Sequence, residues 1–289
     1  MSSEAMYPEN ERTVREIMKG GYDLHTHTYP SHFRRSLDDV ELVRQCDAFE
    51  MAGAMLKCHY EQTASRAILV NKYGGAKAKA FGSISLNSTV GGMNPYAVDR
   101  ALVLGAKMIW LPTKDSENGM INKPDKAFSR PPVRFLGDDG KPVREFYEVL
   151  EVAKKYGVCV ATGHIYPHEA IIACREGLAH GVNMILTHPD IELTLISLED
   201  QVALAREGVM VEKVWGTVWD KSITVPEMAA TIRAIGPEHI FIDSDFGQAD
   251  NPPPVYGIHD FVSGMLREGI SKEDLKTMLC TNPARIVGE

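Results

Sequence analysis

Two histidines of this sequence are spaced so that they could bind one ion. The segment Asp23-Leu-His25-Thr-His27 places them two residues apart at the end of an apolar run. Alternate side chains of a β-strand point to the same face, so both imidazoles would project together from a strand. A His-x-His pair alone also occurs by chance on surface strands. Its position at the end of an apolar run is what suggests a metal site.

Three further apolar runs end in groups that could join this pair. His164 and His188 end the fifth and sixth such runs, and Asp243 and Asp245 lie at the end of the eighth. Zinc, manganese, iron and nickel accept imidazole and carboxylate ligands and can keep a position open for water. Four histidines and an aspartate at four strand ends are hard to explain as scaffold. We therefore expect one or two divalent metal ions here, with zinc as the first choice.

The elements that would position these groups form a repeated pattern. Eight short apolar runs, several of them β-branched or bounded by Gly and Pro, alternate with segments of helical periodicity. The runs cover residues 22–28, 54–60, 80–87, 106–113, 158–166, 184–189, 209–214 and 240–247. This alternation predicts an α/β protein of the (β/α)₈ (TIM) barrel class, in which functional groups gather at the carboxyl ends of the strands.

One domain over residues 1–289 is expected, with residues 1–20 as an N-terminal extension. Residues 114–143 interrupt the alternation after the fourth run, and within them two short strands are predicted around an Asp-Gly turn. We expect a hairpin-like insertion that covers the active site as a lid, because long loops in compact domains are usually functional. The alternative is a surface loop that has no function. The Pro-rich segment 248–256 is a second candidate lid.

Composition excludes several other classes of protein. The net charge is −8 and no Lys/Arg-rich run occurs, which argues against a nucleic-acid partner. The five cysteines are odd in number and include no CxxC, so a disulfide framework is not expected. The N-terminus lacks the apolar core of a signal peptide, and no apolar run approaches the roughly 18 residues of a membrane span. A cytoplasmic protein is expected.

Together these motifs resemble the amidohydrolase superfamily of metal-dependent hydrolases. The matching features occur in the superfamily's order: His25-x-His27, His164, His188, Ser244-Asp245 and the closing Asn282-Pro-Ala-Arg. The resemblance extends from about Gly20 to Gly288 and is nearest to an uncharacterised single-domain branch.

The resemblance implies a role for each matching residue. His25 and His27 would bind the more buried metal, and Asp245 would bind the same ion and take a proton from its water. His164 and His188 would bind a second metal. In one-metal members His164 would remain a ligand, whereas His188 would contact the water or the substrate.

The bridge between two metals has two candidates in this sequence. Two-metal members often use a carboxylated lysine from strand four, where Lys114 is found. Lys57 and His59, at the end of the second run, would face the barrel interior, where an unpaired ammonium is costly. We prefer Lys57, as a bridge between metals or as a contact for an anionic substrate group. A salt bridge to Glu61 or Glu212 is the alternative.

Three residues are predicted to lie near the substrate. His59 and Glu212 would face the interior, and Tyr166 belongs to a loop that follows a strand. A hydrogen-bonded rim histidine is the alternative for His59, and support of a metal ligand is the alternative for Glu212. Asp245 is preferred to Asp243 as the metal ligand, which leaves Asp243 as a structural acceptor.

The predicted chemistry is hydrolysis of a small molecule. A bound divalent ion lowers the pKa of water to about 7, and Asp245 could move the proton to the leaving group. An amide, a lactone, an ester or a related bond would be cleaved. The alternatives are a mononuclear-zinc non-oxidative decarboxylase, a phosphoesterase and a catalytically silent barrel that serves as a binding protein. A homo-oligomer is suggested by analogy alone.

Overall fold

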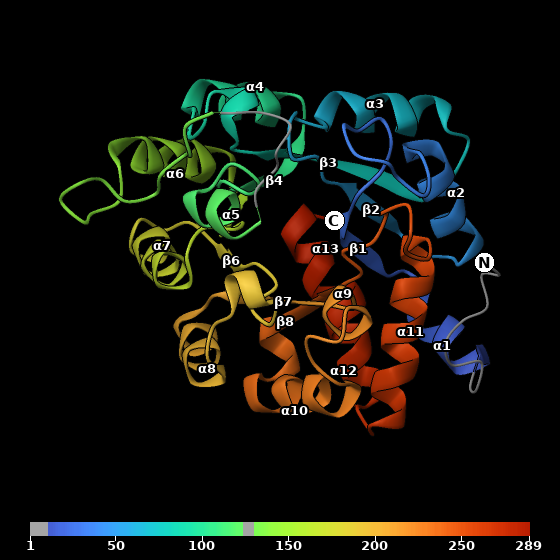
Figure 1. Cartoon of the computed structure of the whole chain (residues 1–289). Coiled ribbons are helices and arrows are strands. Elements are labelled where there is room, and N and C mark those ends of the chain that lie inside the picture. Colours follow the sequence, from blue (N-terminus) through green and yellow to red (C-terminus); the bar gives the residue numbers. More distant parts are fainter. Residues whose placement is uncertain (1–10, 124–129) are drawn as a thin grey trace. The chain divides into compact units, whose positions relative to one another are not determined.

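A computed structural model describes residues 11–123 and 130–289 of the chain (Figure 1). Its eight strands belong to one sheet in the consecutive order β1 to β8, and the strand pairs are parallel. Helices alternate with the strands along the chain. This is the topology of the (β/α)₈ barrel, so the predicted fold class is confirmed. The strands are β1 (Tyr22–Thr26), β2 (Gly53–Leu56), β3 (Lys79–Ser85), β4 (Ala106–Trp110), β5 (Cys159–Ala161), β6 (Met184–Leu186), β7 (Met210–Val214) and β8 (Ile240–Asp243).

The helices begin and end at residues that the sequence marks clearly. Asp38 and Thr224 form capping boxes at two helix starts, and Gly157 in a left-handed conformation ends a third helix. The helices are α1 (Glu11–Met18), α2 (Asp39–Ala48), α3 (Ala64–Tyr73), α4 (Pro95–Val103), α5 (Glu117–Asn122), α6 (Arg144–Tyr156), α7 (Pro167–Ala179), α8 (Leu198–Glu207), α9 (Gly216–Trp219), α10 (Val225–Ile235), α11 (Pro254–Arg267), α12 (Lys272–Lys276) and α13 (Asn282–Val287). None of the helices among the described residues is long and apolar enough to cross a membrane.

The chain divides into two compact units. The first contains the described residues up to 57 together with 65–82 and 212–289. In it β1 pairs with β2, Thr26 forms a parallel bridge with Phe246 beyond β8, and α1 packs on α11. The buried side chains of Leu24, Ile17 and Phe261 belong to its core.

The second unit contains residues 58–64 and the described part of 83–211. β4, β5 and β6 pair in sequence there, and α4 and α6 lie against each other. The apolar face of α6, which includes Phe146 and Leu150, is buried with Ile109 of β4 and Val160 of β5. Each unit thus has its own core.

All eight predicted strands are present, but most of them end before the residues singled out for chemistry. β6 ends at Leu186, before His188, and β8 ends at Asp243, before Asp245. The physical reason is the backbone: His188 has a φ of 26° and Asp245 a φ of 53°, and neither value is compatible with a strand.

The predicted insertion at 114–143 contains α5 and a tight turn. Leu136 and Pro142 form an isolated antiparallel bridge, and the backbone N–H of Gly137 donates to the carbonyl of Lys141 at 2.8 Å. No named strand occurs among the described residues of this insertion. Residues 124–129 of the predicted lid, and 1–10 of the predicted N-terminal extension, lie outside the described residues. The lid and the single domain stay predictions.

Candidate metal centre

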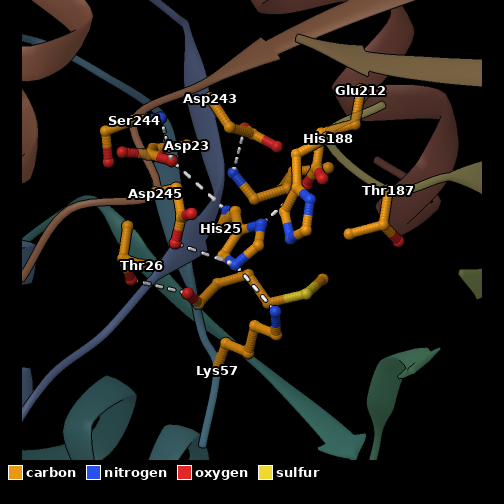
Figure 2. A network of polar contacts seen from close by, with 12 residues as sticks. Asp23, His25, Thr26, Lys57, Thr187, His188, Glu212, Asp243, Ser244 and Asp245 are labelled. Atoms are coloured by element: carbon orange, nitrogen blue, oxygen red, sulfur yellow. Dashed lines mark hydrogen bonds and ion pairs between the residues drawn. The ribbon is translucent and has the colours of Figure 1, made fainter. Parts of the chain in front are cut away.

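His25, His27 and Asp245 come together at the carboxyl ends of β1 and β8. Figure 2 shows the Asp245 carboxylate turned toward the His25 ring. Asp245 Oδ1 lies 3.1 Å from His25 Nε2 and 3.2 Å from His27 Nε2. Ligands bound tetrahedrally to one zinc ion at about 2.0–2.1 Å would lie about 3.3 Å apart, so the spacing fits a single small cation. Among the described residues, this is the one group of three His, Cys, Asp or Glu side chains with such convergence.

The two imidazoles are held with their Nε2 atoms toward Asp245. His25 Nδ1 lies 2.9 Å from Glu212 Oε1, and His27 Nδ1 lies 3.2 Å from the backbone oxygen of Lys57. A carbonyl, like an ionised carboxylate, only accepts, so each Nδ1 carries the proton and each Nε2 keeps its lone pair. Carboxylate or carbonyl partners of this kind commonly orient metal-binding histidines.

The electrostatics of the group also suit a cation. Burial lowers the pKa of His27 to about 3, although the nearby Asp245 carboxylate opposes the shift. His27 is therefore neutral at neutral pH, and two nitrogen lone pairs converge on a carboxylate oxygen. Three acceptors this close repel one another. Lys57 Nζ, 2.8 Å from His25 Nε2, offsets part of this repulsion, and a divalent cation between the three atoms would offset it further. The site fits the divalent ion that the sequence predicts.

Lys57 lies beside this group, directly after β2. Its side chain is buried, and its Nζ is 2.8 Å from His25 Nε2. Figure 2 shows the Lys57 side chain directed toward the His25 ring. The predicted inward orientation of Lys57 is thus observed, with a histidine as its neighbour. Whether Lys57 bridges two metals stays a prediction. Lys114 is half-buried beyond β4 and belongs to the second unit.

Two buried aspartates contact the backbone behind the histidines. Asp243 Oδ1 accepts from the N–H of Leu24 at 2.6 Å, and Asp23 Oδ1 accepts from the N–H of Ser244 at 3.2 Å. Burial raises the pKa of Asp23 to about 7, and burial together with the charges of Asp23 and Glu212 raises the pKa of Asp243. Asp243 thus contacts backbone whereas Asp245 contacts both histidines, a difference that favours Asp245 as the metal ligand.

The backbone around Asp245 is unusual in a way that positions its side chain. Asp245 is left-handed at φ 53°, a conformation that aspartate tolerates better than most residues. Its N–H donates to the carbonyl of His25 at 3.0 Å, and the N–H of His27 donates to the carbonyl of Phe246 at 2.8 Å. The strands also shift register between Asp23 and Thr26, a bulge of the kind that re-aims side chains near active sites. The turn that follows β8 is therefore fixed against β1.

The other histidines singled out in the sequence gather within the second unit. The ring centroids of His59 and His164 lie 5.8 Å apart, and those of His164 and His188 lie 5.1 Å apart. His59 Nδ1 is 2.8 Å from Thr113 Oγ1, and His188 Nδ1 is 3.0 Å from Thr194 Oγ1. Their roles as ligands or substrate contacts stay predictions.

Tyr166 lies at the start of α7, where its ring stacks on that of His168 with the centroids 5.6 Å apart. One polar network of the second unit was not predicted from the sequence. Asn87 accepts from the N–H of Thr113 at 2.8 Å and donates to the carbonyl of His59 at 2.6 Å. Both Asn87 and Thr113 are the last residues of predicted strands, and that position was a signal of their role.

Comparison with known proteins gives one matching family model and several solved structures of similar fold. A family model described as "Family of unknown function (DUF6282)" matches residues 20–212. No match was found among curated proteins. Among solved structures, an amidohydrolase from Pseudomonas aeruginosa shares 12% identity at a TM-score of 0.65, with 96% of this chain and 99% of that chain covered.

Two further solved structures are similar over nearly their whole length. A putative 2-pyrone-4,6-dicarboxylic acid hydrolase from Pseudomonas putida has 13% identity, a TM-score of 0.62, and coverage of 93% of this chain and 97% of that chain. A mutant organophosphorus hydrolase from Deinococcus radiodurans has 12% identity, a TM-score of 0.63, and coverage of 94% of both chains. At such identities the likeness shows the fold, and it confirms the expected resemblance to the amidohydrolases at that level.

Proposed function

The chain belongs to the DUF6282 family, whose function is unknown, and we propose that it is a metal-dependent hydrolase of the amidohydrolase type. The observation that carries the proposal is the convergence of His25 Nε2, His27 Nε2 and Asp245 Oδ1, three acceptors that a divalent cation would satisfy. We name zinc as the first candidate, because two imidazoles and one carboxylate form a typical set of catalytic zinc ligands.

Several residues at or beside His25, His27 and Asp245 (the metal triad) have separate roles in the proposed hydrolysis. A divalent ion bound there would lower the pKa of a water molecule and polarise the bond to be cleaved. Asp245 accepts the proton of the attacking water and returns it to the leaving group. Glu212 and the carbonyl of Lys57 keep the two imidazoles in the ligating tautomer. The Lys57 ammonium places a positive charge beside the reacting group.

The names of the structural relatives support hydrolysis without fixing the bond. One relative is called an amidohydrolase, one a pyrone dicarboxylic acid hydrolase and one an organophosphorus hydrolase. We propose an amide, lactone or ester as the bond to be cleaved. We also propose a reducing compartment such as the cytoplasm, because all five cysteines are free.

A non-oxidative decarboxylase is the second candidate. It is favoured by the finding that the described residues contain one convergent ligand group, as a one-metal enzyme requires. The two candidates differ in product, because a decarboxylase releases carbon dioxide from a carboxylic acid and a hydrolase consumes water.

Metal content tests the proposal directly. Protein purified without a metal-affinity tag would be analysed for bound metal, beside His25→Ala and the control His239→Ala. His239 precedes β8 and so lies at the opposite end of that strand from Asp245. We expect one or two metals per chain in the wild type and in His239→Ala, and almost none in His25→Ala. Retained metal in His25→Ala, or none in reconstituted wild type, would contradict the proposal.

The metal content of Lys57→Ala and assays with a panel of substrates then distinguish between the proposed functions. A stoichiometry near two that falls on removal of Lys57 would identify a bridging lysine. A stoichiometry near one, unchanged in Lys57→Ala, would favour the one-metal arrangement. Lactones, amides and phosphoesters would be assayed for hydrolysis, and carboxylic acids for release of carbon dioxide.

A further inference from the structure

Trp219 is the one tryptophan of the chain whose side chain reaches solvent. Of the three tryptophans, Trp110 and Trp215 are fully buried, whereas 37% of the surface of Trp219 is exposed. Burial of an indole ring stabilises a fold strongly because the ring is large. Tryptophans that stay partly exposed are enriched where proteins bind other molecules. The position of Trp219 relative to the metal triad therefore bears on the substrate.

Trp219 ends α9, the short helix that follows the carboxyl end of β7, where barrels of this kind place their active sites. The N–H of Gly216, the first residue of α9, donates to the carbonyl of Ser244 at 3.0 Å. A Cβ on Gly216 would lie 3.8 Å from Asp245 Oδ2, so α9 begins beside that carboxylate. Trp219 is three residues further on, a rise of about 4.5 Å along the helix. Trp219 is thus close to the metal triad, and all of these residues belong to the first unit.

The Trp219 ring packs on the residue that follows Asp245. Its centroid lies 5.7 Å from that of Phe246, and the ring planes meet at 74°, an edge-to-face arrangement that aromatic pairs favour. Phe246 is fully buried, and its carbonyl accepts the N–H of His27 at 2.8 Å. The indole is therefore packed against the backbone segment that carries Asp245 and pairs with His27.

Three hydrogen bonds in series also connect the indole to the backbone of Asp245. Trp219 Nε1 donates to Asn251 Oδ1 at 3.1 Å, and Asn251 Nδ2 donates to Gln248 Oε1 at 2.9 Å. Gln248 Nε2 then donates to the carbonyl of Asp245 at 2.9 Å. An indole N–H only donates, so Asn251 must present its oxygen to Trp219 and its amide N–H to Gln248. The place of the ring relative to Asp245 is therefore fixed by the fold, before any ligand binds.

A ring fixed in this way suits a planar, apolar partner. The indole N–H is used by Asn251, so the exposed part of Trp219 offers mainly carbon surface. An aromatic ring of a ligand packs favourably on such a surface, either stacked or edge to face. Because the indole is rigid and already held in place, little conformational entropy is lost on contact. Three consecutive prolines at 252–254 follow Asn251 and extend the apolar character of this loop.

We propose that the substrate carries an aromatic ring close to the bond that is cleaved, and that this ring packs on Trp219. The inference rests on the proposed function, since it assigns a substrate class to the same site. Trp219 is thus a residue that determines specificity. Asn251 and Gln248 are positioning residues, because they act on the substrate only through the indole and Asp245.

Three phosphonates that differ in their organic group test the ring contact without requiring catalysis. Methylphosphonate, phenylphosphonate and benzylphosphonate carry the same anionic group for the metal, and the last two present a ring at different distances from it. Calorimetric titrations of metal-reconstituted protein would compare wild type, Trp219→Ala, Trp219→Phe and Tyr73→Ala. Tyr73 is the matched control, because it is a 69% exposed aromatic residue of the first unit that precedes β3 and so lies before the amino end of that strand.

The affinity ratio between a ring-bearing phosphonate and methylphosphonate is the quantity that reports on Trp219. We expect wild type to bind at least one ring-bearing compound about tenfold more tightly than methylphosphonate. The ratio should fall to within about twofold in Trp219→Ala and stay at the wild-type value in Tyr73→Ala. Trp219→Phe should keep part of the ratio, because a phenyl ring still packs on an aromatic ligand.

Tryptophan fluorescence gives a second readout that needs no variant. Trp110 and Trp215 are fully buried, so quenching by acrylamide acts mainly on Trp219. The ring-bearing phosphonates should shield Trp219 and lower the quenching constant, whereas methylphosphonate should leave it unchanged.

The outcomes separate this inference from the proposed function. Metal content measured on the same samples should be equal in wild type and Trp219→Ala. Metal-loaded wild type without a preference for the ring, or a preference that persists in Trp219→Ala, would overturn the role of Trp219 and leave the hydrolase standing. Protein that takes up no metal, but whose Trp219 is shielded by the ring-bearing compounds, would instead contradict the hydrolase.

Discussion

The two units hold their strand-end histidines with different chemistry. In the first unit, His25 Nδ1 meets the carboxylate of Glu212 at 2.9 Å. In the second, His59 Nδ1 meets the hydroxyl of Thr113 at 2.8 Å. A carboxylate is a charged acceptor that fixes the tautomer and raises the basicity of the ring, whereas a hydroxyl can donate or accept. The hydrogen-bond partner of Nδ1 therefore distinguishes a metal-binding histidine better than the histidine alone does.

His188 is an intermediate case that makes the difference clearer. Thr194 donates its hydroxyl to the carbonyl of His188 at 2.9 Å, so it must accept from His188 Nδ1. The tautomer is therefore fixed by a neutral partner, as it is for His27 by the carbonyl of Lys57, and not by a carboxylate as for His25. His188 Nε2 keeps a lone pair without the added basicity that a carboxylate gives. We expect His188 to be the weaker ligand.

The largest effect on stability is expected at Gly247, where close backbone packing positions His27 relative to Asp245. A Cβ on Gly247 would lie 1.7 Å from the carbonyl oxygen of His27, and the φ of Gly247 is 121°. Gly247→Ala should therefore lower the free energy of unfolding by roughly 3 kcal/mol and displace His27 from Asp245. Urea unfolding of the metal-free protein gives the first quantity, and metal titration reports the second.

The control for this prediction is another left-handed glycine of the first unit. Gly269 has a φ of 79° and no atom within 4 Å of an added Cβ. Gly269→Ala should cost about 1 kcal/mol and leave metal affinity unchanged. Equal losses of stability in the two variants would show that the close approach of Gly247 to His27 does not determine the site.

A smaller effect, on metal affinity, is expected when the hydrogen-bond partners of the histidine rings are substituted. Glu212→Gln keeps the shape of the side chain but removes its charge, so metal affinity should fall by about 10- to 100-fold. Thr194→Val removes the hydroxyl beside His188, and its effect should be no more than a few-fold. Competition with a chromophoric chelator measures both. A larger loss in Thr194→Val than in Glu212→Gln would reverse the comparison between the units.

The sequence predicts the framework of this site better than its details. The eight strands and the inward placement of Lys57 follow from apolar runs and from the period of two in a strand. The contact between Lys57 and His25 does not, because it depends on side-chain torsions and on the register between β1 and β2.

The predicted strands extend too far at their carboxyl ends. The predicted runs include His188 and Asp245, whose residue types are compatible with a strand, whereas β6 ends at Leu186 and β8 at Asp243. Positive φ values at these two residues are tertiary in origin, and the only sign in the sequence is Gly247, two residues after Asp245. The functional side chains thus belong to the first residues of the loops, where packing against neighbouring strands sets the backbone.

The smallest of the three effects is a dependence of stability on pH that arises from the first unit. Burial lowers the pKa of His27 to about 3, whereas an unfolded histidine titrates near 6.5. Between these values the unfolded chain binds a proton that the folded one does not, so stability falls as the pH drops from about 6.5 toward 3. One such proton corresponds to about 1.4 kcal/mol per pH unit. Asp23 acts in the opposite direction, because its pKa is raised to about 7, and it therefore reduces the net slope of the wild type.

The difference between wild type and His27→Asn isolates this contribution, since Asp23 is present in both. Urea unfolding of metal-free protein at several values between about pH 4.5 and 6.5 should give a slope smaller by about 1.4 kcal/mol per pH unit in His27→Asn. The control His239→Asn, at the other end of β8, should keep the wild-type slope. An unchanged slope in His27→Asn would mean that the ring takes up a proton in the folded state. The triad would then hold a proton where we place the metal, and the contrast between the two units would lose its chemical basis.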